Sequence, residues 1–292
     1  MTRHPSLLAA ALSGALLLGA AAGAEGAADN PAFGVSPLLS DAEMGAGINR
    51  LADGMGEMVA DIGLVLRRAP AGTEDVSPEA LDDVLRFAPF AVARELARDD
   101  LVLLMRHGPT DWSRRDLKDV RPADCANQRV MTPLGEERMR AMGILMAGNG
   151  LRPGKVVASE WCRNQQTLAR LLEGFALVDP LYAAAVPVET DADLNLLLSL
   201  RGAPDVTAMR AAILAWDGPE PGGPDGPLLM VSHFTNIAEL TDVHVYEGEA
   251  LVLDPRRGGR VIGHLRLRSA APDVGHFEPG ESATGLAPEA DE

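Results

Sequence analysis

The chain has few cysteines, few aromatic residues and an excess of acid over base. Its 292 residues include 26 Lys and Arg against 42 Asp and Glu, which gives a formal net charge of −16. This balance argues against non-specific binding to nucleic acid, which needs a basic surface, and against attachment to an anionic membrane surface. Two cysteines exclude a disulfide-rich miniprotein and a zinc module built from several cysteines. If the ligand is an anion, a local cluster of arginines must bind it against the overall field.

Residues 1–24 have the pattern of a secretion signal. Arg3 supplies a positive start, the run Leu7–Leu18 is apolar and uncharged, and the small residues Ala22-Gly23-Ala24 fit a cleavage site. The apolar run is shorter than the roughly 20 residues that a spanning helix needs, although an uncleaved anchor is an alternative. We therefore expect a periplasmic or secreted mature protein without stable membrane insertion.

The rest of the chain divides into four segments. Residues 25–40 are rich in small residues and predict a linker, and residues 41–98 carry apolar side chains at helical spacing. The second segment predicts an N-terminal helical extension, which we expect to cap the sheet rather than to bind a partner. Residues 99–269 predict the main domain. Residues 270–292 are acidic and rich in Pro, Gly and Ala, and predict a disordered tail.

Short apolar runs in the main domain predict buried strands. Three of them, residues 101–105, 156–158 and 228–231, are each followed by a helical pattern. Residues 251–253 and 261–267, separated by a turn, predict a terminal hairpin. The alternation of strands and helices predicts an α/β fold, a three-layer α/β/α sandwich with a mostly parallel central sheet.

Polar and basic residues follow the three strands that precede helices. Arg106-His107 comes after the first, Ser159 and Arg163 after the second, and Ser232-His233 after the third. Because ligands bind at the carboxyl ends of strands in such sheets, these residues predict a cationic pocket. The pocket suits a phosphoryl group, since arginine offers paired donors to its oxygens and imidazole is a nucleophile or donor. The alternatives are histidines buried in the core and an Arg163 exposed to solvent.

The residues around the first strand end resemble a known motif. The segment Leu104–Ser113, with Arg106-His107-Gly108 within it, is similar to the phosphate-binding motif of the histidine phosphatase superfamily, the phosphoglycerate-mutase-like proteins. The resemblance covers about residues 100–268 and implies a phosphoglycerate-mutase-like fold. Further segments resemble an exported bacterial branch, mostly periplasmic histidine phosphatases: Asp124–Arg129, Ser159–Arg163, Ser232–Ile237 and Gly248–Val252.

The resemblance implies a role for each matching residue. His107 matches the nucleophile that becomes phosphohistidine, and Arg106, Arg163 and His233 match the phosphate clamp. Ser113 falls where many members carry an asparagine that contacts phosphate. We expect a neutral His107 whose tautomer a backbone carbonyl selects, a protonated His233, and hydrolysis by water without metal or cofactor. The absence of a side chain on Gly108 predicts close approach of the backbone to the ligand.

The proton donor for the leaving group is the weakest match. One branch places an Asp directly after the second histidine, where this chain has Phe234. The other branch has a Glu between the second and third strands, where the candidates here are Glu189, Asp191 and Asp193. We favour Asp193 as general acid, with a solvated acidic loop as the alternative.

These observations predict an exported phosphomonoesterase that acts on a small phosphorylated substrate or a phosphoglycan. The alternative is a protein that binds a phosphosugar or phosphoglycan with little or no turnover, because no obvious acid is present. A mutase is less favoured, since an exported protein would not meet glycolytic intermediates.

The two cysteines are expected to form a disulfide. Cys125 and Cys162 are an even pair in a chain predicted to enter an oxidising compartment. The bond would link the loop after the first strand to the segment that carries Arg163. Two buried free thiols are the alternative.

Overall fold

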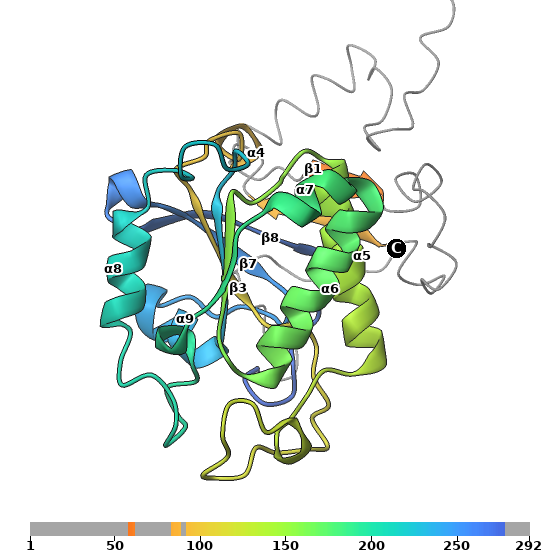
Figure 1. The fold of residues 1–292 in the computed structure, drawn as a ribbon. Coiled ribbons are helices and arrows are strands. Elements are labelled where there is room, and N and C mark those ends of the chain that lie inside the picture. Colours follow the sequence, from red (N-terminus) through yellow and green to blue (C-terminus); the bar gives the residue numbers. More distant parts are fainter. Residues whose placement is uncertain (1–57, 62–82, 89–91, 278–292) are drawn as a thin grey trace, which may run out of the picture.

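The centre of the structure is a sheet with helices on both of its sides (Figure 1). The computed structural model describes residues 58–61, 83–88 and 92–277, and in these residues the sheet has eight strands. The strands are β1 (Met58–Asp61), β2 (Val84–Ala88), β3 (Val102–Arg106), β4 (Lys155–Ala158), β5 (Val188–Thr190), β6 (Leu228–Ser232), β7 (Ala250–Asp254) and β8 (Arg260–Leu267). The α-helices are α4 (Val92–Glu95), α5 (Pro133–Gly148), α6 (Cys162–Val178), α7 (Pro180–Ala185), α8 (Thr207–Ala215) and α9 (Phe234–Thr241). The 3-10 turns are η1 (Cys125–Asn127), η2 (Ala192–Leu194) and η3 (Pro255–Arg257).

The sheet is mixed rather than mostly parallel. Its strand order is β1-β2-β8-β7-β3-β6-β4-β5. The pairs β3–β6, β6–β4 and β4–β5 are parallel. The pairs β1–β2, β2–β8, β8–β7 and β7–β3 are antiparallel. The α/β class predicted from the sequence is confirmed, but the expected mostly parallel sheet is wrong. The reason is the hairpin of β7 and β8. A short connection can join only antiparallel strands, and β7 pairs with the edge of β3 that β6 does not occupy.

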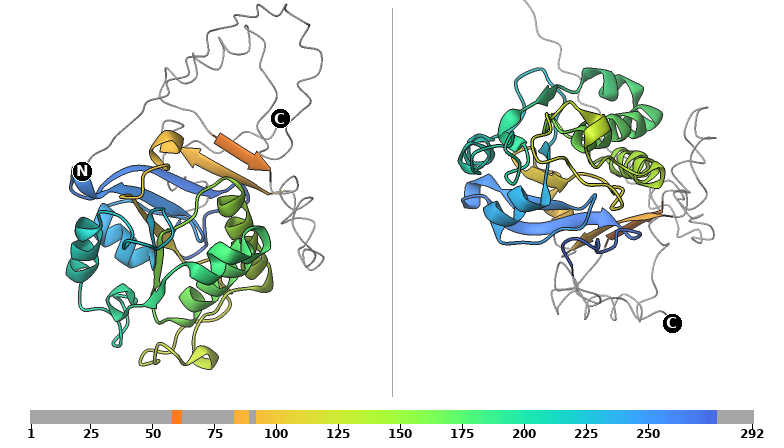
Figure 2. Two further views of the ribbon diagram at one scale, coloured as in Figure 1. Left: turned by 45° about the horizontal axis from the view of Figure 1, so that its top comes forward. Right: turned by 90° about the horizontal axis from the view of Figure 1, so that it is seen from below.

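The N-terminal extension contributes strands where helices were predicted. β1 pairs with β2, and β2 pairs with β8, so both extend the antiparallel half of the sheet (Figure 2). The helical prediction for residues 41–98 is therefore wrong at these two segments. The apolar run of β2 is too short for its periodicity to distinguish a strand from a helix. Its pairing with β8 determines that it is a strand. The rest of that range, apart from residues 83 and 92–98, lies outside the described residues, as do residues 1–24 and 25–40.

Two apolar clusters on opposite faces hold the sheet between its helices. Leu103 and Met105 of β3 join the cluster under α5, α6 and α7, while Val102 and Leu104 join the cluster under α8 and α9. Figure 1 shows the two groups of helices on opposite sides of β3. Both faces of β3 are buried, which explains why its sequence is a continuous apolar run rather than an alternating one.

The strands with polar ends agree with the sequence prediction. β3, β4 and β6 coincide with the predicted runs at 101–105, 156–158 and 228–231 to within one residue at each end. The parallel pairing of β3 with β6 and of β6 with β4 brings their three carboxyl ends to one edge of the sheet. This edge holds the candidate site.

Helix α6, which delivers Arg163, lies backbone to backbone against α5. A Cβ atom on Gly143 would overlap the carbonyl of Leu171, and one on Gly174 would overlap the carbonyl of Arg140. Larger residues at either glycine would push the helices apart. None of the helices in the described ranges combines the length and the apolar character that crossing a bilayer requires.

Candidate active site

The register between β3 and β6 places two basic strand ends side by side. Arg106 lies opposite Ser232, and the backbone N–H of His107 donates to the Ser232 carbonyl at 3.1 Å. The rings of His107 and His233 lie with their centroids 5.6 Å apart. The sequence therefore brings the two histidines together through strand pairing alone.

His107 is held as a neutral ring in one tautomer. Its Nδ1 lies 3.0 Å from the Gly108 carbonyl, and because a carbonyl only accepts, Nδ1 must carry the proton. The Nε2 atom then has a free electron pair. Burial, together with the charges of Arg163 and Arg106, holds the pKa of His107 well below its usual 6.5. The tautomer expected from the sequence is present.

Gly108 is required for packing rather than for close approach of a ligand. A Cβ atom there would overlap the side chains of Met139 and Met131, which belong to the core under α5. Its backbone N–H donates to Thr167 Oγ1 at 2.8 Å. The strand end is thus anchored to α6, and the expectation that Gly108 makes room for ligand is not what the structure shows.

His233 is linked to a chain of polar groups that sets its tautomer. Asn195 Nδ2 donates to Glu160, so Asn195 Oδ1 accepts the hydroxyl proton of Ser159 at 2.8 Å. Ser159 Oγ must then accept from His233 Nε2 at 3.1 Å. Burial, followed by the charges of the arginines, holds the pKa of His233 well below 6.5. In this structure the ring is neutral, in contrast to the protonated His233 expected from the sequence.

Arg163 is a buried cation in the first turn of α6, where the helix dipole is unfavourable to it. The carboxylate of Asp116 compensates, at 3.1 Å from Nη1. Burial lowers the pKa of Arg163 to about 10, against the opposing effect of Asp116, so the side chain stays charged at neutral pH. Its buried Nε has no hydrogen-bond partner among the residues described.

Arg106 is buried and does not line the open cavity. Its Nη1 donates to the Val245 carbonyl at 2.9 Å and to Asp273 at 2.6 Å. As with Arg163, the Nε atom is buried without a partner in the described ranges, and so is Nδ1 of His233. Two guanidinium N–H donors and one imidazole nitrogen are thus buried without a partner in the described residues, and the two N–H groups are costly unless an anion accepts from them.

The pocket beside His107 has a volume of about 460 Å³ and two kinds of wall. One wall is basic, and the mouth carries apolar side chains such as Leu196, Leu198 and Val274. The lining residues are His107, Trp112, Arg114, Arg115, Asp116, Arg129, Arg163, Leu196, Leu198, His233, Phe234, Thr235, Val274, Gly275 and His276. The arrangement suits a small organic molecule that carries a compact anion.

Arg129 and Asp116 are among the lining residues that were not assigned a role from the sequence. The Arg129 guanidinium stacks on the Trp112 ring at 3.6 Å, and burial lowers its pKa. Asp116 accepts from the Arg129 backbone N–H at 2.7 Å as well as from Arg163. Arg129 lies in the quoted segment Asp124–Arg129, so that resemblance was a signal, whereas Asp116 had none.

Besides Arg106, the predicted site residues Ser113 and Asp193 do not line the pocket. Ser113 is exposed, and its hydroxyl donates to Asp111 at 2.6 Å. Asp193 is exposed on η2, where its backbone N–H is capped by Asp191. The structure gives no support to phosphate contact by Ser113 or to Asp193 as general acid. The same holds for Glu189, whose carboxylate forms an ion pair with Lys155.

The segment after β8 folds back onto the site instead of forming a tail. Asp273 is buried against Arg106, and His276 stacks on Phe234 with centroids 3.9 Å apart. The prediction of a disordered tail from residue 270 is therefore wrong for residues 270–277. One reason is the buried charge of Arg106: its ion pair with Glu247 is 3.5 Å long, and Asp273 adds a hydrogen-bonded carboxylate at 2.6 Å. Residues 278–292 lie outside the described part of the chain.

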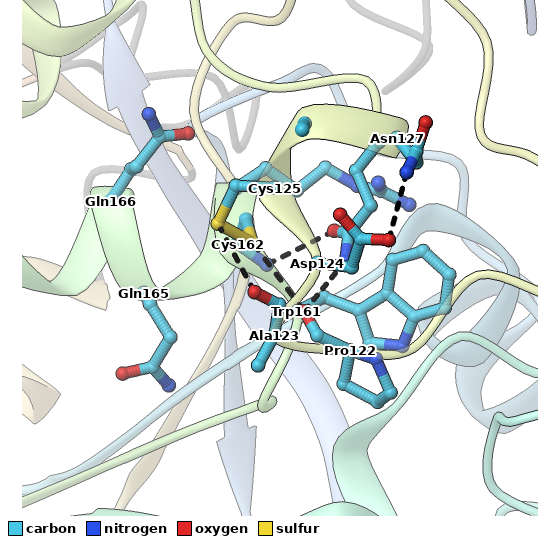
Figure 3. The surroundings of a disulfide bond; sticks show 12 residues. Pro122, Ala123, Asp124, Cys125, Asn127, Trp161, Cys162, Gln165 and Gln166 are labelled. Carbon is cyan, nitrogen blue, oxygen red and sulfur yellow. Dashed lines mark hydrogen bonds between the residues drawn. A yellow bond between two sulfur atoms is a disulfide. The ribbon is translucent and has the colours of Figure 1, made fainter.

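A disulfide joins Cys125 to Cys162, as predicted (Figure 3). Cys125 begins η1 in the long loop after β3, and Cys162 is the first residue of α6, next to Arg163. Gln128 ties the same two segments, because its Oε1 accepts from the Cys162 N–H at 3.1 Å and its Nε2 donates to the Pro122 carbonyl at 2.6 Å. The bond therefore fixes the loop that supplies Asp116 and Arg129 against α6.

The side chains present suit an anion better than a resident metal. Within the described ranges, His, Cys, Asp and Glu nowhere gather in groups of three or more that could bind a metal ion. The pocket itself is lined by four arginines and one carboxylate, and that carboxylate is engaged by Arg163.

Comparison with known proteins gives structural neighbours only. No protein-family model and no curated protein matches the chain. Similar solved structures include the protein histidine phosphatase SixA in complex with tungstate, at 21% identity and a TM-score of 0.40, over 57% of this chain and 96% of that one. A mycobacterial glucosyl-3-phosphoglycerate phosphatase is 16% identical, with a TM-score of 0.36, over 59% and 99%. The alpha-ribazole phosphatase from Shigella flexneri is 18% identical, with a TM-score of 0.33, over 53% and 90%.

The two buried histidines predict a stability that falls in mild acid. In the folded chain the pKa values of His107 and His233 lie below 6.5, whereas the unfolded chain takes up protons near that pH. The unfolded state then binds more protons, so the free energy of unfolding decreases as pH drops below about 6.5, by up to about 1.4 kcal/mol per pH unit for each histidine. Urea unfolding at about pH 5 and about pH 7 measures this slope. His107→Gln should reduce it, and an identical slope in that variant would contradict the assignment.

The disulfide predicts a loss of stability on reduction. It closes a loop with a sequence separation of 37, for which the chain-entropy model gives about 4 kcal/mol. We expect reduction, or replacement of both Cys125 and Cys162 by serine, to lower the melting temperature. Alkylation of the denatured, unreduced protein followed by mass measurement is the direct check. Two alkylated cysteines in that experiment would show that the bond is absent.

Proposed function

We propose that this protein is an exported phosphomonoesterase of the histidine phosphatase superfamily, which transfers a phosphoryl group to His107 and needs no metal. One observation carries the proposal. The neutral His107, with its Nε2 electron pair free, lines one pocket with Arg163 and His233, whose Nε and Nδ1 atoms are buried without a partner in the described residues. A phosphoryl group accepts from Arg163 Nε, and from His233 Nδ1 once that ring is protonated, and it presents phosphorus to the nucleophile.

The reaction follows from these groups in two steps. His107 Nε2 attacks phosphorus, and the bond from phosphorus to the alcohol oxygen breaks. Arg163 Nε stabilises the charge on the phosphoryl oxygens by direct contact, and the buried positive charge of Arg106 adds to the field at the site. Water then attacks the phosphohistidine and releases phosphate, which returns the electron pair to His107.

His233 is expected to take up a proton when the anion binds. A dianionic ester beside it opposes the effect of the arginines and favours the imidazolium form. Nδ1, which lacks a partner, then becomes a donor to the phosphoryl group. The neutral ring in the structure and the protonated ring expected from the sequence are thus two states of one site.

The substrate class follows from the pocket. Its volume of about 460 Å³ admits one small phosphate ester, such as a phosphosugar or the phosphorylated end of a phosphoglycan. The apolar side chains at the mouth contact the part of the ester that lies outside the basic wall. Export rests on the sequence of residues 1–24, and a disulfide in a small cationic site suits an oxidising compartment.

A second candidate function is binding of a phosphate ester without turnover. It is favoured by one observation, that Asp116, the carboxylate among the described lining residues, is already bound to Arg163. Incubation with p-nitrophenyl phosphate, whose leaving group needs little protonation, separates the two functions. Release of nitrophenol with saturation supports the enzyme, and binding without release supports the alternative.

Replacement of the nucleophile should abolish turnover. We expect His107→Ala to lose essentially all hydrolysis of p-nitrophenyl phosphate, because the variant lacks the Nε2 electron pair that the proposed mechanism requires. Rapid quenching of the wild-type reaction without acid should leave phosphate covalently bound to the protein, in a form that is labile to acid and stable to base. The variant should carry no such phosphate. Urea unfolding checks that the variant is folded. Near-normal activity in His107→Ala would overturn the mechanism.

Removal of one clamp arginine should slow the reaction strongly. Arg163→Ala deletes a preorganised donor, for which we expect a loss of about 2–4 kcal/mol of transition-state stabilisation, roughly a 30- to 1,000-fold decrease in kcat/KM. Arg170→Ala is the matched control, because Arg170 lies on the same helix and pairs with Glu136 and Glu173 outside the pocket. Equal effects of the two changes would place Arg163 outside the reaction.

A further inference from the structure

The segment after β8 brings a carboxylate–histidine pair to the pocket. His276 Nδ1 lies 2.8 Å from Asp273 Oδ1, and His276 lines the cavity together with His107. Burial raises the pKa of Asp273, but hydrogen bonding from His276 and the charge of Arg106 outweigh it and hold that pKa well below its usual value. Asp273 is therefore an anion, and Nδ1 donates to it.

The opposite edge of the His276 ring is available for chemistry. Its Nε2 atom has no hydrogen-bond partner within residues 58–61, 83–88 and 92–277. The ring stacks on Phe234 at 3.9 Å and meets Trp112 edge-on at 5.4 Å. Both aromatic rings also line the pocket, so they hold the imidazole in place without using its free nitrogen.

The other acidic groups near the pocket are already engaged. Asp116 accepts from Arg163 and from the Arg129 N–H. Glu247, which is buried, accepts from the hydroxyl and the N–H of Thr110. The Nε2 proton of His233 is directed to Ser159. In the described part of the site, His276 is the lining side chain that has both a free nitrogen and a carboxylate to stabilise its protonated form.

We propose that His276 is the general acid and base of the reaction and that Asp273 positions it, an inference that rests on the proposed phosphatase function. As His107 attacks phosphorus, the departing alcohol oxygen takes the Nε2 proton of the His276 imidazolium, which becomes neutral. In the second step the neutral Nε2 takes a proton from the attacking water. Phosphate leaves, and His276 is again an imidazolium.

Charged groups of both signs surround His276. Asp273 Oδ1 lies 2.8 Å from its Nδ1, and Arg106 Nη2 lies 3.3 Å from the same atom. Arg114, Arg115, Arg129 and Asp116 line the same pocket. A bound phosphate dianion would add negative charge to this surrounding.

The test compares esters whose leaving groups differ in their need for a proton. For His276→Gln we expect kcat on glycerol 2-phosphate to fall by about 100-fold or more, since general acids contribute about 10²- to 10⁴-fold. The loss on p-nitrophenyl phosphate should be under about tenfold. Added imidazole should restore part of the glycerol phosphate activity of His276→Gly. Asp273→Asn should reduce kcat on both esters, because Asp273 also pairs with Arg106, with the larger loss on glycerol 2-phosphate.

The control variant is His244→Gln. His244 contacts the same Phe234 ring, at 5.1 Å, but is exposed and does not line the pocket, so both substrates should be hydrolysed as in the wild type. Melting temperatures of all variants test folding. Equal losses of His276→Gln on both esters would overturn the role of His276. Increased activity of Asp273→Asn would also overturn it, because that result would show that the segment after β8 obstructs the site. If the wild type hydrolyses neither ester, the phosphatase function itself fails.

Discussion

The site depends on the cost of burying two arginines at the end of a sheet. Arg106 and Arg163 are essentially inaccessible to solvent, and a buried guanidinium must have a carboxylate close by. Neither β3 nor the first turn of α6 contains one, so each cation recruits a carboxylate from a loop. Asp116 comes from the long loop after β3, and Asp273 comes from the segment after β8. These two ion pairs place the loops that form most of the pocket wall.

The same positive charge sets the chemistry of the histidines. With two arginines and Arg129 nearby and little solvent, the imidazolium form is unfavourable, so both pKa values fall. For His107 this suits the proposed role of nucleophile, and the Gly108 carbonyl selects the tautomer with a free Nε2. For His233 it leaves a ring that, on the proposed mechanism, becomes a donor only when an anion binds. One electrostatic field thus acts on both histidines of the candidate site.

Part of this arrangement is readable from the sequence. Arg106, His107, His233 and Arg163 follow buried strands, and parallel pairing of those strands is enough to gather them, so the local pattern predicted them. The cysteine pair was likewise predictable from its count and setting. Asp273 and His276 were not, because their contact with Arg106 spans a sequence separation of up to 170 and their own segment has the composition of a disordered tail. The strands β1 and β2 were missed since short apolar runs carry no decisive period and sheet pairing fixes them.

The segment after β8 connects charge compensation with catalysis. Asp273 contacts Arg106 through Oδ2 and His276 through Oδ1, so one carboxylate serves the clamp and the proposed acid together. Neutralising Asp273 would leave Arg106 without its closest counter-ion and His276 without its hydrogen-bond acceptor. The two functions are coupled through the same side chain, and their energies should not be additive. On the proposed mechanism, no proton donor is needed in the loops where the resemblance to histidine phosphatases suggests one. In this chain the carboxylate that balances the buried arginine also forms a hydrogen bond with an imidazole that lines the pocket.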